Sequence, residues 1–189
     1  TRVLLCLDST EDVVAEAMEK GCEMVIAHHP IVFKGLKKFN GNSYVERTVM
    51  AAVKNDIALY AMHTNLDNVP WGVNKKIMQK LGIDIVDTGS AILSFTKSPS
   101  THYLAGAGMI GDLNKPVSEN EFMTMLKHNM NVGIIKHTKL LGKPISRVAV
   151  CGGAGSFLLQ KAIERQADIF ITSDFTYHQF FDAEGKIII

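Results

Sequence analysis

The sequence predicts an α/β fold with two lobes, built largely on parallel sheet. In both halves of the 189-residue chain, short apolar runs rich in branched residues alternate with segments of helical periodicity. Strands separated by helix-sized segments are typical of βαβ units, in which neighbouring strands run parallel. Residues 88–105 are less regular and contain Gly89, Pro99 and several serines and threonines. We interpret this stretch as the connection between two lobes, 1–90 and 91–189, or as the edge of one.

The first lobe is predicted to alternate three strands with three helices. Ser9 followed by Asp12 resembles a capping box for the first helix, and Ser43 with Glu46 gives the same signal for the second. A glycine closes the first helix and another closes the third. The predicted strands are 2–7, 24–27 and 57–62, and the predicted helices are 9–20, 43–55 and 72–81.

The second lobe resumes with an apolar, glycine-containing strand. Ser118 with Glu121 predicts the start of a helix that runs to about residue 128. A glycine turn over residues 152–156 leads into a helix over 157–166. The remaining predicted strands are 108–111, 132–135, 147–151, 168–172 and 186–189.

Composition narrows the class of protein. Apolar residues make up 47% of the chain, and 20 basic residues balance 19 acidic ones, so the chain is globular and shows no basic nucleic-acid footprint. No apolar run approaches the roughly 20 residues that span a bilayer, and the first residues do not have the layout of a signal peptide. Three widely spaced cysteines form no disulfide framework, which favours a cytoplasmic location.

The unusual polar residues follow the predicted strands, where parallel α/β sheets bind their ligands. His28 and His29 come after one strand, and His63, Asn65 and Asp67 come after the next. Imidazole and carboxylate ligands without thiolate favour a divalent ion such as Zn, Mn or Fe. We therefore expect a metal site made of these side chains.

Two adjacent histidines on an extended segment point to opposite faces, so they cannot easily chelate one ion. At a strand end they can instead reach two neighbouring ions, with Asp67 bridging them. Two ions held about 3.5–4 Å apart form a hydrolytic pair, in which one activates water and the other polarises the group attacked. The alternative is that both histidines are hydrogen-bonded polar groups in a turn. His63 is either a further ligand or a residue that orients Asp67.

Other residues are weaker candidates. Gly152, Gly153 and Gly155 could cradle a substrate phosphate at a helix start, or could serve close packing of strand and helix. Asp174 either faces the site or caps a helix. Asp8 either orients a ligand or caps the first helix. Cys151, just before the glycine pair, is the one cysteine whose surroundings suggest chemistry.

An ordered set of motifs resembles the NIF-three-like family, whose members often carry the label GTP cyclohydrolase I type 2. The resemblance covers nearly the whole chain. The motifs are Leu7-Asp8-Ser9-Thr10, Ala27-His28-His29-Pro30-Ile31-Val32-Phe33, His63-Thr64-Asn65-Leu66-Asp67, Gly72-Val73-Asn74, Gly108-Met109-Ile110-Gly111, Val150-Cys151-Gly152-Gly153-Ala154-Gly155-Ser156, Ala167-Asp168-Ile169-Phe170-Ile171-Thr172-Ser173-Asp174 and Tyr177-His178.

The resemblance implies two α/β lobes with mixed, largely parallel sheets, a dinuclear metal cleft between the lobes, and a ring-shaped homohexamer. It assigns His28, His29 and Asp67 as ligands, and places Asp174 and His178 in the pocket, with His178 able to exchange protons. The family's remaining ligands are a His and a Glu in a GH-x-x-x-E segment after the last strand. That segment, and an N-terminal helix with a WDNxGL-like segment, are absent here, so we expect this sequence to be shortened at both ends.

The function expected from these observations is a metal-dependent hydrolase with two divalent ions, acting on a small nucleotide-like or phosphorylated substrate. No residue selects guanine, so opening of the GTP ring is carried as the family's label only. A second possibility is a non-catalytic, oligomeric metal-binding protein that acts through protein partners. A third is a nucleotide-binding module that uses the glycine turn alone.

Overall fold

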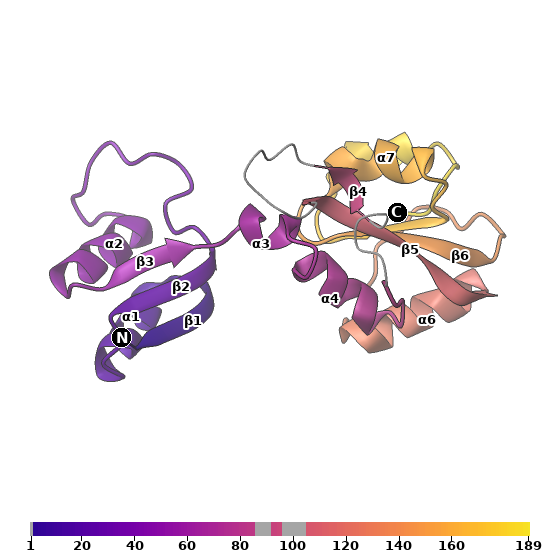
Figure 1. Cartoon of the computed structure of the whole chain (residues 1–189). Coiled ribbons are helices and arrows are strands. Elements are labelled where there is room, and N and C mark those ends of the chain that lie inside the picture. The colour runs from indigo at the N-terminus through magenta and orange to yellow at the C-terminus, as the bar shows by residue number, and fades with distance from the viewer. Residues whose placement is uncertain (1, 86–91, 96–104) are drawn as a thin grey trace. The chain divides into compact units, whose positions relative to one another are not determined.

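A computed structural model describes residues 2–85, 92–95 and 105–189 (Figure 1). Contacts between residues divide the chain into a first unit that ends at Leu66 and a second unit that begins at Asp67. No helix in the described ranges is long and apolar enough to cross a membrane. The elements are β1 (Val3–Asp8), α1 (Glu11–Glu19), β2 (Met24–His29), α2 (Tyr44–Lys54), β3 (Ala58–Ala61), α3 (Thr64–Asn68), α4 (Val73–Lys80), β4 (Ile92–Phe95), β5 (Gly106–Val117), α6 (Glu119–Met130), β6 (Ile145–Cys151), η1 (Ser156–Leu158), α7 (Leu159–Glu164), β7 (Ile169–Thr172) and η2 (Tyr177–Ala183).

The first unit is a parallel sheet in the order β1-β2-β3, with α1 and α2 packed on one face (Figure 1). Val14 and Ala17 of α1 and Ala52 of α2 share a buried core with Val25 of β2. The other face of the sheet exposes apolar side chains, since residues alternate between the faces of a strand. These are Val3, Leu5, Leu7 and Tyr60.

The second unit is a mixed sheet in the order β4-β5-β6-β7. Strand β5 is antiparallel to both β4 and β6, whereas β6 and β7 are parallel. Helices α4 and α6 share one apolar core with the sheet, and α7 shares a second core on the opposite face. The predicted α/β class with mixed sheets is confirmed, but only the first sheet is parallel throughout its described strands.

The units divide at a different place from the predicted boundary at residues 90 and 91. Met78, Leu81, Ile83 and Ile85 are buried in the same core as residues of β5 and β6. Helix α4 therefore belongs to the second unit. Of the predicted connection over 88–105, residues 92–95 form β4 and residue 105 precedes β5, while 88–91 and 96–104 lie outside the described residues.

Two predicted strands differ in the structure. Residues 132–135 form no strand, and Ile134 is 82% exposed, because this short apolar run has no strand beside it among the described residues. In place of the strand predicted over 186–189, the described chain has a single parallel bridge between Ile188 and Ile169 of β7. Ile187 and Ile188 are nevertheless buried in the core.

Helix starts follow the predicted capping pattern in two of three cases. Ser43 and Ser118 cap α2 and α6, and each side chain accepts a hydrogen bond from the backbone three residues later. Helix α1 is capped by Thr10 and not by the predicted Ser9, which is buried instead. The carboxylate of Glu46 also accepts hydrogen bonds from the backbone of Asn40 and Gly41, and these bonds hold its pKa below the ordinary value.

We expect the Glu46→Gln variant to be less stable at neutral pH and to lose less stability in acid than the wild type. A depressed pKa contributes stability that is complete above the unfolded-state pKa and disappears as the pH falls through the lower folded-state pKa. Thermal unfolding measured from pH 7 to pH 3 checks this. Glu121→Gln is the matched control, because Glu121 occupies the same position after Ser118 but its carboxylate accepts no hydrogen bond from a described residue. Equal pH profiles for the two variants would contradict the assignment.

We expect Gly155→Ala to lower the free energy of unfolding by about 1–3 kcal/mol, the usual cost of overpacking. A Cβ atom at residue 155 would lie 2.6 Å from the Cβ of Cys151 and 2.7 Å from Oγ1 of Thr172. Gly133→Ala is the control, because its added Cβ meets no described atom within 4 Å. Urea denaturation of both variants gives the comparison, and an unchanged Gly155→Ala protein would show that the turn can expand freely.

Candidate metal centre

Three histidines gather at the edge of the first sheet where its parallel strands end. His28 and His29 are the last two residues of β2, and His63 lies two residues beyond the end of β3. The strands pair in register, with Asp8 of β1 beside His29 and Ala27 beside Ala61. The three strand ends therefore bring one carboxylate and three imidazoles to one edge, as the sequence predicted for the histidines.

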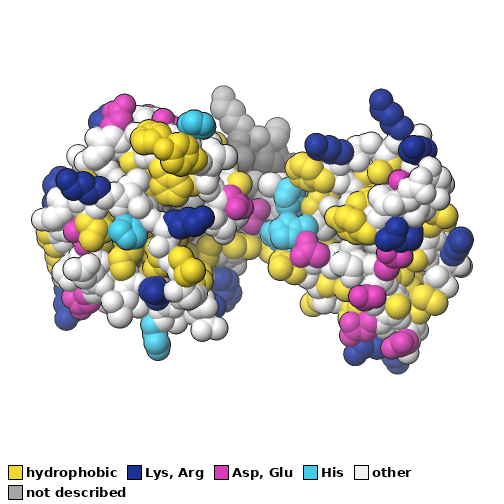
Figure 2. All heavy atoms as spheres, turned by 180° about the vertical axis from the view of Figure 1, so that it is seen from behind, with side chains coloured by type: hydrophobic (Ala, Val, Ile, Leu, Met, Phe, Trp, Pro, Cys, Tyr) yellow, Lys and Arg dark blue, Asp and Glu magenta, His cyan; other side chains and the backbone are white. Residues whose placement is uncertain are grey.

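The three imidazole rings are close to one another. Ring centroids are 4.7 Å apart for His28 and His29, 6.1 Å for His28 and His63, and 6.2 Å for His29 and His63. Histidine side chains form a visible group on the surface of this unit in Figure 2. His28 and His29 are neighbours on β2 and so start on opposite faces of the strand, yet both rings lie at its end.

His63 has a backbone conformation that side chains rarely adopt. Its φ is +40°, in the left-handed region, and its amide donates a hydrogen bond of 2.8 Å to the carbonyl of His28. A non-glycine residue in this region costs free energy, and such strained residues concentrate at functional sites. The conformation brings the His63 ring beside the other two.

Asp8 orients His29 and does not cap the first helix, which resolves the two interpretations of Asp8. Nδ1 of His29 lies 2.8 Å from Oδ1 of Asp8, while Thr10 caps α1. An ionised carboxylate has no hydrogen to donate, so Nδ1 of His29 is the donor of this hydrogen bond. In the neutral imidazole, Nε2 then keeps its lone pair. An imidazole held in this way by a carboxylate is the usual arrangement of a metal-binding histidine.

Asp67 lies on α3, four residues after His63, and is the first residue of the second unit. Its carbonyl accepts a hydrogen bond of 3.0 Å from the side chain of Asn74, which is only 2% exposed. The same Asn74 amide accepts a hydrogen bond of 2.9 Å from the backbone of Gly152. Asn74 thus joins the backbone of the predicted ligand to the glycine turn, across 78 residues of sequence.

Cys151 is not primed for nucleophilic chemistry. Burial, together with the negative charge of Asp67, raises the pKa of its thiol to about 11. A thiol with such a pKa is protonated near neutral pH, and the thiolate is the reactive form. The chemistry suggested by the position of Cys151 is therefore not supported.

The donor set fits a divalent ion in its chemistry, although it is not a closed site. In residues 2–85, 92–95 and 105–189, no group of three or more His, Cys, Asp or Glu side chains is arranged to hold one ion. The prediction itself divides His28 and His29 between two ions, and the resemblance adds a His and a Glu of a GH-x-x-x-E segment as further ligands. Nitrogen and oxygen donors of this kind suit Zn, Mn or Fe.

The glycine turn is built for packing. Gly152 donates its amide hydrogen to Asn74, and Gly155 donates its own to Oγ1 of Thr172 at 2.9 Å. Gly153 has a φ of +74°, and its carbonyl accepts a hydrogen bond from the hydroxyl of Thr172. Because two of the three amides that a phosphate would need are used within the protein, these bonds favour the packing alternative.

Asp174 and His178 belong to the second unit and are both exposed. The amide of Asp174 donates a hydrogen bond to the carbonyl of Gly153. The residue also lines a mostly apolar pocket of about 860 Å³ around β7. His178 lies on η2 with its ring 5.3 Å from that of Tyr177. No hydrogen bond joins Asp174 to His178 in the described part of the chain. The proposed acid–base role of His178 therefore stays a prediction.

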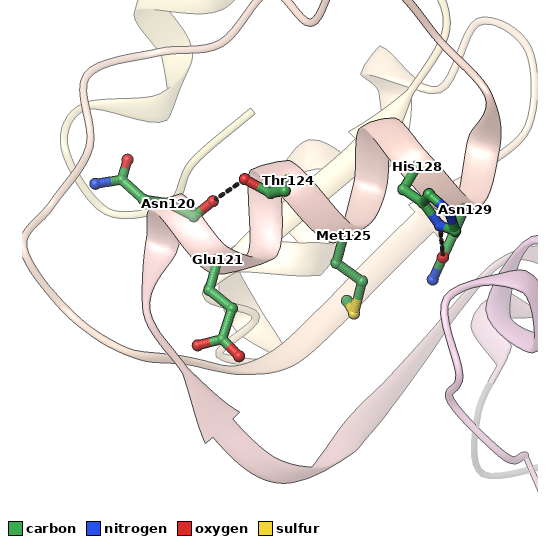
Figure 3. A pocket seen from close by; sticks show the side chains of 6 residues that line it. All are labelled: Asn120, Glu121, Thr124, Met125, His128 and Asn129. Carbon is green, nitrogen blue, oxygen red and sulfur yellow. Dashed lines mark hydrogen bonds between the residues drawn. The ribbon is translucent and has the colours of Figure 1, made fainter.

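A hollow of about 560 Å³ on the surface of α6 offers no chemistry (Figure 3). Three of its polar side chains, those of Thr124, His128 and Asn129, bond within α6 itself. The Thr124 hydroxyl donates to the carbonyl of Asn120, and His128 lies 3.1 Å from the side chain of Asn129. These groups do not converge on a common point.

Sequence reasoning missed one contact of the histidine cluster and left a second one open. The ring of Phe33 meets that of His63 edge-on, with centroids 6.1 Å apart. The pairing of Asp8 with His29 was only one of two alternatives. The sequence signal for the pairing of Asp8 with His29 was that both residues stand at the ends of predicted strands.

Comparison with known proteins agrees with the motifs. The chain matches the family Duf34/NIF3 (NGG1p interacting factor 3) over residues 1–189. A Clostridium perfringens protein named GTP cyclohydrolase 1 type 2 homolog is 33% identical over 181 residues, which cover 94% of this chain and 65% of the relative. The chain therefore spans slightly less than two thirds of the length of this relative.

Two crystal structures share the fold. A Staphylococcus aureus protein superposes with a TM-score of 0.84 at 26% identity, covering all of this chain and 73% of the other. A Bacillus cereus protein related to NIF3 gives a TM-score of 0.87 at 23% identity, covering all of this chain and 76% of the other. The motifs, the match along the whole chain and the shared fold place this chain in the Duf34/NIF3 family.

Proposed function

We propose that this protein binds two divalent metal ions through His28, His29 and Asp67, with His63 as a further ligand or an orienting residue. We also propose that it is a metal-dependent hydrolase of a small nucleotide-like or phosphorylated substrate. The observation that carries the proposal is the group of three imidazole rings, 4.7–6.2 Å apart, at the carboxyl edge of a parallel sheet. Ligands bind at this edge in α/β proteins.

The chain's own residues account for the binding chemistry. Asp8 keeps the proton of His29 on Nδ1, and the left-handed backbone of His63 turns its ring toward the other two. Asn74 fixes the carbonyl of Asp67. When bound, the ions would supply activation of water and polarisation of the group attacked.

The substrate class is supported by the relatives. Curated relatives carry the name GTP cyclohydrolase 1 type 2 homolog, which makes hydrolytic opening of the guanine ring of GTP the first reaction to test. By the same resemblance we propose a homo-oligomer, with a hexamer as the expected size. From the cysteine pattern we propose a cytoplasmic location.

Metal content per chain is the first test, by plasma mass spectrometry on the protein expressed from its complete gene. We expect close to two transition-metal ions per chain after reconstitution with Zn, Mn or Fe, and loss of most of them in the double variant His28→Ala/His29→Ala. The matched control is His128→Ala/His137→Ala, two exposed histidines of the second unit.

The metal site and the hydrolase function are contradicted by different outcomes. Metal-free wild-type protein after reconstitution contradicts the metal site. Loaded protein that turns over neither GTP nor a panel of nucleotides and phosphoesters contradicts the hydrolase and leaves the non-catalytic metal-binding protein.

The hydrogen bond between Asp8 and His29 gives a further prediction. Asp8→Asn should weaken Zn²⁺ or Co²⁺ affinity by about 10–100-fold, the usual effect of removing the carboxylate behind a ligating histidine. Competition titration with a chromogenic chelator measures this, and Co²⁺ spectra report the ligand environment. Asp12→Asn on α1 is the control. Unchanged affinity in Asp8→Asn, beside a clear loss in His29→Ala, would mean that Asp8 is only a neighbour.

A further inference from the structure

The connection from β2 to α2 is a long segment with a distinctive composition. This β2–α2 loop, residues 30–42, begins directly after His29 and stands out from the sheet in Figure 1. It contains three lysines, Lys34, Lys37 and Lys38, two phenylalanines, and no aspartate or glutamate. Its charge is therefore +3 within 13 residues, in a chain whose total formal charge is +1.

Both phenylalanines of the loop lie in solvent. Phe33 is 74% exposed and Phe39 is 56% exposed. Leaving large aromatic side chains in water forfeits the free energy of burial, and apolar side chains grouped in this way often mark a binding surface. The Phe33 ring also contacts His63, so this end of the loop lies at the histidine cluster.

The loop is held at both ends. Its first residue continues β2, and its last residues are fixed by α2. The Glu46 carboxylate accepts hydrogen bonds of 2.8 Å from Asn40 and 2.9 Å from Gly41, and the Arg47 guanidinium donates to the carbonyl of Gly41. Rings on a loop that is tethered at both ends lose less conformational freedom on binding than rings on a free segment.

The three lysines are exposed, and none forms an ion pair with a residue in the described part of the chain. Some other exposed cations are paired, such as Arg47 with Glu11 and Lys161 with Glu164. Unpaired ammonium groups attract phosphate groups, and these three fall within residues 34–38.

A small cavity adjoins the base of the loop. It has a volume of about 340 Å³ and is lined by His29, by Pro30, Ile31 and Val32 of the loop's start, and by side chains of α2 and β3 that include Val49 and Tyr60. The volume lies in the range of small-molecule sites, and the wall is predominantly apolar. The loop thus offers cations, exposed aromatic rings and an apolar hollow beside the histidines.

We propose that the β2–α2 loop binds a nucleoside polyphosphate, with Lys34, Lys37 and Lys38 contacting the phosphates and Phe33 and Phe39 contacting the planar base. The proposal deepens the hydrolase function and depends on it only for what happens to the ligand. Binding to the loop itself requires no metal ion.

The test measures binding by isothermal titration calorimetry in the presence of a chelator, on the protein expressed from its complete gene. The probes are GTP, inorganic triphosphate and guanosine. We expect the triple variant Lys34→Glu/Lys37→Glu/Lys38→Glu to bind GTP and triphosphate at least tenfold more weakly and guanosine with unchanged affinity. We expect the double variant Phe33→Ala/Phe39→Ala to bind GTP and guanosine more weakly and triphosphate with unchanged affinity.

The control variant is Lys136→Glu/Lys139→Glu/Lys143→Glu, which reverses three exposed lysines of the second unit and changes the net charge equally. Unchanged binding in this control supports the loop as the site. Equal weakening by both triple variants overturns the proposal, because it shows attraction by overall charge. Absence of GTP binding to the wild type at millimolar concentration also overturns it.

A single-stranded RNA oligonucleotide is the competing ligand. If the loop lysines control RNA binding but not GTP binding, the loop is a nucleic-acid surface and the proposal is wrong. Metal content of the same variants is measured in parallel. Nucleotide binding without any metal loading would remove the hydrolase function and retain the loop as a binding site, so the two proposals fail separately.

Discussion

Parallel hydrogen bonding among β1, β2 and β3 is the constraint on which the candidate site depends. In a parallel sheet the carboxyl ends of neighbouring strands lie at the same edge, and the register sets which side chains meet there. The pairing of Asp8 with His29 is part of that register. A slip of one residue would turn each side chain to the opposite face and separate the carboxylate from the imidazole.

Long-range hydrogen bonds fix what the strands leave open. Glu46 gathers the end of the β2–α2 loop through two backbone amides, and Asn74 joins the carbonyl of Asp67 to Gly152. Both side chains are buried, where an unsatisfied polar group would cost more free energy than the bond itself contributes. The backbone around the candidate ligands is thus held by the hydrogen bonds of two buried polar side chains.

Much of the fold and part of the site follow from local patterns. Ser43 and Ser118 mark helix starts because capping requires only residues three apart. The histidines were found because they stand at or just beyond strand ends. The boundary between the units was misplaced because burial of Met78 depends on strands more than 30 residues away. The run 132–135 looked like a strand because a short apolar segment carries no information about a partner. The bonds of Asn74 could not be predicted, since they span 78 residues and need the fold itself.

Each unit has its own hydrophobic core in the described part of the chain. The core of the first unit is small, formed around Val14, Ala17 and Val25, while the second unit has two larger clusters. Small domains bury a lower fraction of their surface and are correspondingly less stable. We therefore expect the first unit, which carries the histidine cluster, to unfold at a lower temperature than the second. A metal ion at a free concentration of 100 times its dissociation constant would stabilise the first unit by about 2.7 kcal/mol. Calorimetric traces would then show a lower transition that moves with ion concentration toward a fixed upper one.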